Sequence, residues 1–454
     1  MAKGTISALV ELIAQASKIV EAAYESAEKP WVPDLDDVEP HPLDEHVWSK
    51  ELKTAVQTIE GACAQLCATI AKPSYTLAHK NLGFIEPVCI NVALTYKIPD
   101  LLMKKPEGMH ITEIGEKTGL EPSKVGRVLR LLATKHVFRE VSENVFANNR
   151  LSVLLNSQNP LYSLGLHATD HVQKSANSLT DVLGDKEWGH SFSPKHTAFN
   201  RYSQFPGSLF EYFEGGTPKG SEVGARFGRG MVAWAQAFDS EAVIDQFPWM
   251  EIGERATVCD VGGGVGNMLI ALAKRYPKLR LTLQDLPERT LQARMEVWPV
   301  KCPEAIAEKR IEFQPIDFLK EAPVPGCQIY YLKNIIHDWP DSEAITILSN
   351  VRKAMHPSSR ALLHEFILQS TNRLPASEAK YEQAPEPLLP NYGLGRITQY
   401  YVDLNMMVQV NSEERRLSEY IKLGEAAGLQ FEKLWDFGTT GLVEYRLNNA
   451  GANL

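Results

Sequence analysis

The stretch VCDVGGGVG, residues 258–266, decides the fold of this 454-residue chain. Its apolar start predicts a buried strand, its glycines predict a tight turn, and the following NMLIALAKRY predicts a helix. Glycines let the backbone approach a ligand closely, and a helix start presents free N–H groups. Asn267 stands where a dinucleotide-binding Gly-x-Gly-x-x-Gly has its last glycine, so the Gly-x-Gly-x-Gly spacing disfavours NAD.

Strand-like segments alternate with helical segments from residue 256 onward. The strand-like segments are TVCDVGG, RLTLQDL, RIEFQPID, QIYYLKNII, ALLHEFIL, LQFEKLWDFG and GLVEYRL. This alternation predicts an α/β domain over residues 256–454, in which helices cover both faces of a parallel sheet. The Pro-rich, polar segment 369–397 interrupts the pattern directly after a strand, and we interpret it as a surface insertion and a candidate lid.

The N-terminal part of the chain predicts a helical extension over residues 1–75. Residues 5–27 place Ile6, Leu9 and Ile13 among the apolar residues of one helical face. The prolines and acids of PWVPDLDDVEPHP, residues 30–42, predict an extended linker, and a second helix is expected from about residue 44 to 71. The main body of the protein or another copy of the chain would cover the apolar face; a loosely attached arm is the alternative.

Residues 76–160 predict a winged helix. Two short amphipathic helices flank a turn at Thr118-Gly119, and a small hairpin follows around residues 142–144. One interpretation is DNA binding through the second helix, which carries Lys124, Arg127 and Arg130. The other is a packing and dimerisation module. We favour the second, because residues 111–140 carry six basic and four acidic side chains, only a small positive surplus.

Residues 161–255 predict a helical connector rich in aromatic side chains. We expect most of these side chains to be core and a few to wall an apolar substrate pocket, with Trp234 as a candidate.

The composition excludes several classes of protein. With 44% hydrophobic and 23% charged residues the chain is ordinary globular material, and its net charge of −9 argues against a nucleic-acid partner. No stretch approaches the roughly 18 apolar residues of a membrane span, and the N-terminus lacks a signal-peptide pattern. Six scattered cysteines favour a reducing, cytoplasmic location, and Cys63 and Cys67 lack the second ligand pair of a zinc site.

The second and third strands of the sheet end in groups that suit an adenosine. Asp285 follows the glycines by about twenty residues, where a carboxylate accepts both ribose hydroxyls. At the next strand end, Asp317 can accept from the adenine amino group while Phe318 packs on the base; a simple loop cap is the alternative for Asp317. Three consecutive strands that end in suitable groups strengthen the interpretation.

The fourth strand runs into KNIIHDWPD, residues 333–341. In a structural interpretation, Asp338 or Asp341 caps the next helix and Pro340 lies in its first turn. That leaves His337 at the ligand end of a strand, where a histidine is a candidate base. A metal site of His337, Asp338 and Asp341 is disfavoured, because no further ligand is evident.

These motifs, in this order, resemble the caffeic-acid-type O-methyltransferases of plants and their fungal relatives. The motifs are the winged helix, the DVGGGVG turn, the DLP segment at 285–287, the Asp317-Phe318 pair and LKNIIHDW at 332–339. The combination is highly specific and spans residues 84–438. It implies a winged-helix dimerisation domain ahead of a Rossmann-like S-adenosylmethionine-binding domain with an antiparallel last strand. It also implies a homodimer formed through the N-terminal helices and the winged helix.

The resemblance also assigns roles to residues. Positions that bind the cofactor in the family match Gly262, Gly264, Asp285, Asp317, Phe318 and Lys333. His337 matches the general base, and Glu365 and Glu414 match the two acids that hold it. The family has Gly-x-Glu-Arg-Thr around the second acid, from which this chain departs with Glu413-Glu414-Arg415-Arg416. Substrate contacts are expected from Trp234, Asp338, Met406 and Met407.

The expected reaction is methyl transfer to a hydroxyl of a small aromatic or polyketide-type molecule. A phenol has a pKa near 10, so a neutral His337 would remove its proton, held by Glu365 or Glu414 at the other ring nitrogen. One alternative keeps the fold and cofactor but steers dehydration or pericyclic ring closure without methyl transfer, with Lys333 polarising a carbonyl. A DNA-binding regulator is the second alternative.

Overall fold

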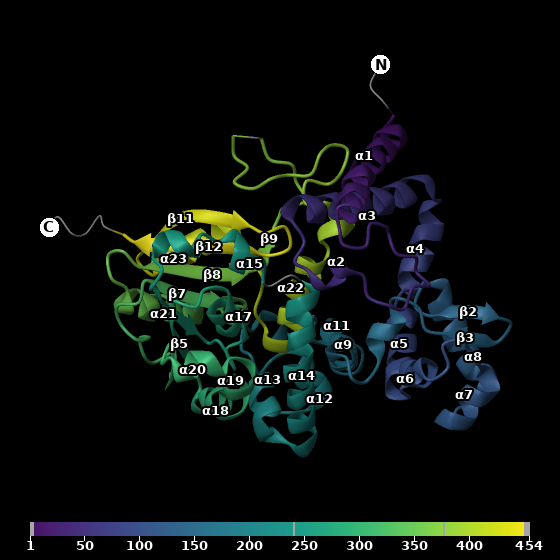
Figure 1. The fold of residues 1–454 in the computed structure, drawn as a ribbon, viewed down its shortest axis with the longest axis horizontal. Helices are drawn as coiled ribbons and strands as arrows, with labels where there is room; N and C mark the ends of the chain where they lie inside the picture. Colours follow the sequence, from purple (N-terminus) through teal and green to yellow (C-terminus); the bar gives the residue numbers. More distant parts are fainter. Residues whose placement is uncertain (1–3, 239–240, 376, 449–454) are drawn as a thin grey trace. The chain divides into compact units, whose positions relative to one another are not determined.

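The structure is a computed structural model that describes residues 4–238, 241–375 and 377–448. The chain divides into two compact units (Figure 1). The first comprises Met1–Phe238 with Ala384–Gly395, and the second comprises Asp239–Gln383 with Arg396–Leu454. The finer division at residues 75, 160 and 255 stays a prediction.

The second unit is built on a seven-stranded sheet in the order β11-β12-β8-β7-β4-β5-β6. Strands β4 to β8 pair in parallel, and β12 runs antiparallel to both β8 and β11. The predicted Rossmann-like fold with an antiparallel last strand is confirmed. The strands are β4 Thr257–Val261, β5 Arg280–Asp285, β6 Ile311–Pro315, β7 Ile329–Lys333, β8 Arg360–Glu365, β11 Leu429–Asp436 and β12 Gly441–Leu447.

Helices cover both faces of this sheet. Side chains alternate along β4, so that Val258 joins the core on one face while Cys259 and Val261 join the core on the other. The helices are α15 Ala242–Gln246, α16 Trp249–Ile252, α17 Asn267–Arg275, α18 Pro287–Gln292, α19 Trp298–Lys301, α20 Pro303–Ala307, α21 Asp341–Ala354, α22 Thr398–Val410 and α23 Leu417–Ala426. A short parallel pair, β9 Ile367–Leu368 with β10 Arg415–Arg416, extends the edge at which the parallel strands end.

The winged helix of the first unit is confirmed. Helices α7 Ile111–Thr118 and α8 Pro122–Thr134 precede the hairpin of β2 Arg139–Ser142 and β3 Val145–Ala147. Gly119 ends α7 in the left-handed conformation, which suits the predicted turn. A third strand, β1 Met109–His110, was not expected; it pairs with β3. Arg130 on α8 donates to Asn144 at 2.9 Å and forms an ion pair with Glu140, so this basic side chain contacts the wing.

The N-terminal extension is helical, as predicted. Helix α1 Thr5–Glu25 packs along α3 Lys50–Ile70. The second helix begins later than expected, because His41 caps a separate one-turn helix, α2 Pro42–Glu45, and Ser49 caps α3. Helix α4 Pro73–Leu82 follows, then α5 Ile85–Thr95 and α6 Ile98–Met103.

Part of the candidate lid is docked on this extension. Ala384, Leu388 and Tyr392 form one buried cluster with Leu9 of α1 and Ala62 of α3. Gln65 of α3 also donates to the carbonyl of Pro387 at 2.8 Å. Residues 384–395 are therefore a docked segment of the first unit, although the chain on either side of them belongs to the second.

The connector is helical and rich in aromatics, as predicted. Phe199, Tyr212 and Phe213 are buried, and they lie close to His167 and His171. The helices are α9 Pro160–Leu166, α10 Gln173–Ala176, α11 Leu179–Leu183, α12 Ala198–Ser203, α13 Leu209–Glu211 and α14 Pro218–Ala237, with π-helical turns at His167–Val172 and Tyr212–Gly216.

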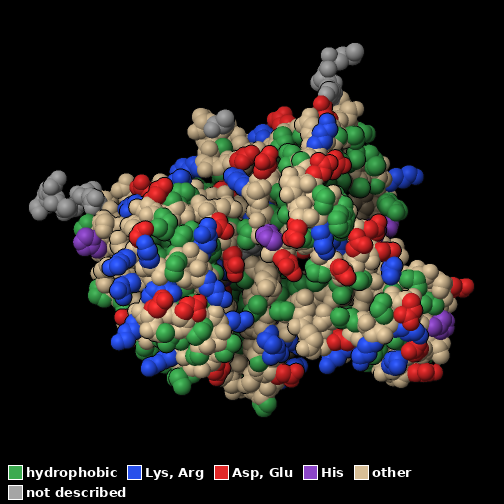
Figure 2. Space-filling view, viewed as in Figure 1, with side chains coloured by type: hydrophobic (Ala, Val, Ile, Leu, Met, Phe, Trp, Pro, Cys, Tyr) green, Lys and Arg blue, Asp and Glu red, His purple; other side chains and the backbone are tan. Residues whose placement is uncertain are grey.

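The surface carries charges of both signs. On the face that Figure 2 shows, lysines and arginines are interspersed with aspartates and glutamates. None of the described helices combines the length and the apolar character needed to cross a bilayer.

Gly395→Ala is expected to destabilise the docked segment. A Cβ at Gly395 would lie 2.0 Å from the carbonyl oxygen of Gln57, so the backbones must move apart, at a cost of about 1–3 kcal/mol. Gly228→Ala in α14 is the matched control, since no described atom lies within 4 Å of its Cβ. Urea unfolding and limited proteolysis of residues 384–395 measure the effect. Equal behaviour of the two variants would contradict the docking.

Candidate active site

The glycine turn after β4 opens a space at the carboxyl edge of the sheet. Gly262 and Gly264 have φ of 78° and 60°, which L side chains rarely adopt. A Cβ at Gly262 would lie 2.5 Å from Ile335 Cδ1, whereas one at Gly264 would meet no described atom within 4 Å. The backbone at Gly264 is therefore accessible to a ligand.

Acidic side chains from the next two strands follow this turn. Asp285 ends β5, and its two oxygens accept from the backbone N–H groups of Gly264 and Leu286, each at 2.7 Å. Asp317 accepts from Leu319 N at 3.2 Å, which is the loop-cap arrangement. Asp317 Oδ2 also forms an ion pair with the Lys320 ammonium at 2.7 Å, so both carboxylates are held by groups of the chain itself.

Phe318 and Lys333 lie in partly buried positions near the turn. The Phe318 ring meets the Trp339 ring edge-on, with centroids 5.9 Å apart. Lys333 ends β7; burial lowers the pKa of its ammonium, and the nearby carboxylates of Asp260 and Glu365 oppose that shift. Burial and the repulsion of Asp285 raise the pKa of Asp260 to about 7.

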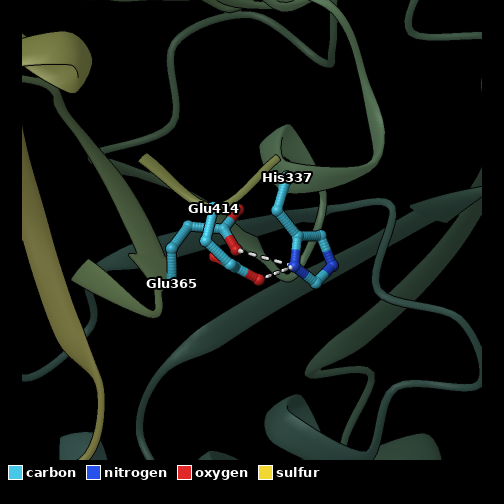
Figure 3. Close-up of side chains that lie close together, drawn as sticks. All are labelled: His337, Glu365 and Glu414. Atoms are coloured by element: carbon cyan, nitrogen blue, oxygen red, sulfur yellow. Dashed lines mark hydrogen bonds and ion pairs between the residues drawn. The ribbon is translucent and has the colours of Figure 1, made fainter. Parts of the chain in front are cut away.

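His337 and two glutamates form a buried cluster at the same edge. His337 lies on the short helical turn Ile336–Asp338 after β7, Glu365 ends β8, and Glu414 directly precedes β10. Figure 3 shows that the three side chains point toward one another. His337 Nδ1 lies 2.5 Å from Glu414 Oε1, within hydrogen-bond distance, and 3.9 Å from Glu365 Oε2.

The two glutamates hold different parts of the turn. Glu414 contacts the ring itself, whereas Glu365 Oε1 accepts from the backbone N–H groups of Ile335 and Ile336 at 3.1 and 2.9 Å. Both carboxylates are buried. The glutamate with the less typical sequence neighbours is thus the one that contacts the imidazole.

Three carboxylates favour the charged form of the imidazole. Burial alone would lower the pKa of His337, but Glu414, Asp338 and Glu365 outweigh it and raise the pKa to about 10. Asp338 Oδ1 lies 3.6 Å from His337 Nε2, and burial raises the pKa of Asp338 to about 6. These carboxylates therefore favour a protonated ring, whereas the sequence predicted a neutral imidazole.

Neither Asp338 nor Asp341 caps helix α21, so the expectation that one of them would is wrong. The helix begins at Asp341 itself, Pro340 is its N-cap residue, and no side-chain hydrogen bond caps it. The Asp341 carboxylate instead accepts from Arg415.

The cluster has the residue types of a metal site but not the spacing of one. Within the described ranges, ligand-type atoms of His337, Glu365 and Glu414 lie within 4.8 Å of one another. Two ligands bonded to one ion at about 2.1 Å would lie roughly 3 Å or more apart. The 2.5 Å contact of His337 with Glu414 fits a direct hydrogen bond instead.

Comparison with known proteins identifies the family of this chain. Residues 197–430 match the O-methyltransferase domain, and residues 79–158 match the O-methyltransferase dimerisation domain. The chain is 42% identical to 3-O-methyltransferase 2 of Phanerochaete chrysosporium, over 97% of each chain. The chain belongs to the O-methyltransferase family.

Solved structures have the same architecture. The mitomycin 7-O-methyltransferase MmcR has a TM-score of 0.65 at 25% identity, covering 83% of this chain and 98% of its own. The structure of a pericyclic reaction enzyme has a TM-score of 0.68 at 20% identity, covering 97% of this chain and all of its own. At 20% identity, the likeness to the pericyclic reaction enzyme shows a shared fold and nothing more. The chain is an enzyme of the O-methyltransferase family, as predicted.

Three of the four residues expected to contact the substrate lie near His337, and the fourth lies in the first unit. Helix α22, which packs against the His337 turn, carries the buried Met406 and the half-buried Met407. Asp338 lies beside the ring. Trp234 is on α14 in the first unit, so its role stays a prediction.

Two residues of the methyltransferase site were not singled out by their sequence. Asp403 of α22 accepts from Glu414 N at 3.0 Å and so holds the glutamate that contacts the ring. Arg415 follows Glu414 and is buried. The Glu-Arg pair of the family motif was the available signal, but it does not reveal where the guanidinium binds.

Glu414→Gln is expected to lower the pKa of His337. Without that carboxylate, burial weighs more heavily against the imidazolium. Glu432→Gln, an exposed glutamate of the same unit, is the matched control. Ring ¹⁵N signals followed against pH measure the shift, with His337 assigned by its absence in His337→Gln. An unchanged titration in Glu414→Gln would contradict the assignment.

Proposed function

We propose that the chain transfers a methyl group from S-adenosylmethionine to a phenolic or enolic hydroxyl of a small aromatic or polyketide-type metabolite, with His337 as general base. The buried contact of His337 with Glu414, on the edge of the sheet that also carries the glycine turn, is the observation that carries the proposal.

The residues at this edge suit S-adenosylmethionine. Gly264 opens onto space, Asp285 suits the ribose, and Asp317 and Phe318 suit the adenine. Carboxyl groups also outnumber cations here: Asp260, Asp285, Asp338, Glu365 and Glu414 accompany Lys333, His337 and Arg415. Such a surface attracts a cationic sulfonium and repels the pyrophosphate of a dinucleotide. When bound, the cofactor supplies an already activated methyl electrophile.

The chain's own residues then have to orient the acceptor and take its proton. His337 Nε2 receives the hydroxyl proton while Glu414 holds Nδ1, which fixes the ring and stabilises the imidazolium that forms. A pKa of about 10 matches that of a phenol, so the proton passes between them without a large free-energy change. Because the ring must first be deprotonated, we expect turnover to rise with pH above neutrality.

His337→Gln is expected to keep cofactor binding and to lower turnover by about 10²–10⁴-fold, because the acceptor loses its base. His356→Gln, an exposed histidine of the same unit, is the matched control. Calorimetry measures cofactor binding. Mass spectrometry measures methylated product and S-adenosylhomocysteine over a panel of phenols and polyketide products. Full activity of His337→Gln would refute the base, and conversion without a methyl gain would support the pericyclic alternative.

We further propose that two copies pair through helix α4 and the start of α5. None of the ten residues of α4 is buried. Tyr75, Leu77, Leu82 and Phe84 are each at least 58% exposed, which an unpaired surface rarely tolerates. The patch is continuous with the matched dimerisation domain at residues 79–158. That match also supports dimerisation as the role of the winged helix.

Leu77→Glu is expected to shift the protein from dimer to monomer, because a charge in a paired apolar surface stays desolvated. Val300→Glu is the control, since Val300 is 76% exposed but lies in the other unit. Light scattering coupled to size-exclusion chromatography measures the mass. A dimer that persists in Leu77→Glu would exclude this surface.

A further inference from the structure

Arg415 is a buried cation that binds both ends of the His337 turn. Its side chain is 1% exposed. Nη1 donates to the carbonyl of Ile336 at 3.0 Å, and Nη2 donates to the carbonyl of Trp339 at 2.8 Å. These two carbonyls bracket His337 and Asp338 in the sequence.

Two carboxylates also face Arg415: Glu413 Oε1 lies 3.7 Å from Nε, and Asp341 forms direct hydrogen bonds. Its Oδ1 accepts from Arg415 Nε at 3.1 Å and from Nη2 at 2.9 Å. A buried guanidinium is costly unless its N–H groups find acceptors, and here two carbonyls and a carboxylate supply them. Asp341 is 66% exposed, so solvent screens this pair and the carbonyl contacts are the buried part of the arrangement.

The backbone places Arg415 and the two glutamates together. Strand β10 pairs in parallel with β9, and Arg415 stands opposite Ile367, two residues after Glu365. Glu414, one residue before Arg415, contacts the ring. Two consecutive residues, Glu414 just before β10 and Arg415 in it, therefore hold the imidazole and the backbone turn that carries it.

We infer that Arg415 is a positioning residue of the active site, which fixes the His337 turn so that Nδ1 stays aligned with Glu414. The inference rests on the proposed function, in which His337 is the base. A planar guanidinium reaches three acceptors in fixed directions, whereas a lysine ammonium is a point charge on a flexible stem. The directed hydrogen bonds of the guanidinium, rather than its charge alone, hold the turn.

Arg415→Lys removes the guanidinium geometry and keeps the positive charge. In the ¹⁵N titration of His337, we expect a lower pKa and a weakened hydrogen-bonded Nδ1 proton, because the ring no longer stays aligned with Glu414. Arg416→Lys, the exposed neighbour on the same strand, is the matched control. If folded Arg415→Lys keeps the His337 signals of the unaltered chain, the inference is wrong.

A second variant covers the possibility that Arg415→Lys does not fold. Asp341→Ala removes the acceptor of Arg415 Nε and Nη2 and leaves Arg415 in place, so it is expected to fold and to move the His337 signals in the same direction by less. Unchanged signals in folded Asp341→Ala, when Arg415→Lys is unfolded, would overturn the inference.

Kinetics separate this inference from the proposed function. With an acceptor that the His337→Gln experiment identifies, Arg415→Lys is expected to lower kcat by about 10–100-fold and to leave the KM of the cofactor unchanged. Combining it with His337→Gln should add no further loss, because both act through one base. Additive losses would overturn the positioning role while leaving His337 as the base; full activity of His337→Gln would refute the proposed function itself.

Discussion

The contact of one buried imidazole with one buried carboxylate constrains the rest of this site. His337 and Glu414 come from segments 77 residues apart, and the sheet edge brings them to 2.5 Å. Neither group is stable alone in a desolvated position, since burial disfavours each charge. The surrounding structure serves the pair: Glu365 holds the backbone before the ring, and Asp403 holds the backbone of Glu414.

The charge of the edge links this pair to the proposed cofactor. Carboxyl groups from five strand ends or adjacent loops outnumber the nearby cations, and a proton on His337 offsets only part of the excess. A cationic ligand lowers the repulsion among these groups, and its positive charge would in turn disfavour the imidazolium. The binding of a sulfonium and the release of the proton from His337 are then favoured by the same electrostatics.

Sequence patterns predicted the parts of this structure that depend on local order along the chain. The alternation of strands and helices predicted the sheet, and the ends of the strands predicted which side chains lie at its edge, because parallel strands share one carboxyl edge.

The contact partners of individual side chains were harder to predict from the sequence. The sequence could not say whether Glu365 or Glu414 reaches the ring, since the choice depends on the pairing of the two-residue strands β9 and β10. Nor could it show that Asp341 binds Arg415 instead of capping a helix, because both uses suit an aspartate at a helix start. The docking of residues 384–395 on α1 and α3 could not be predicted either, because it joins segments more than 300 residues apart.

The most direct measurement is a crystal structure of the chain with S-adenosylhomocysteine and a phenolic acceptor that it methylates. We expect the nucleoside at the Gly264 turn and the acceptor oxygen within about 2.6–3.2 Å of His337 Nε2, with Nδ1 still on Glu414. A ring turned away from the acceptor, or a ligand seated elsewhere in the chain, would contradict it.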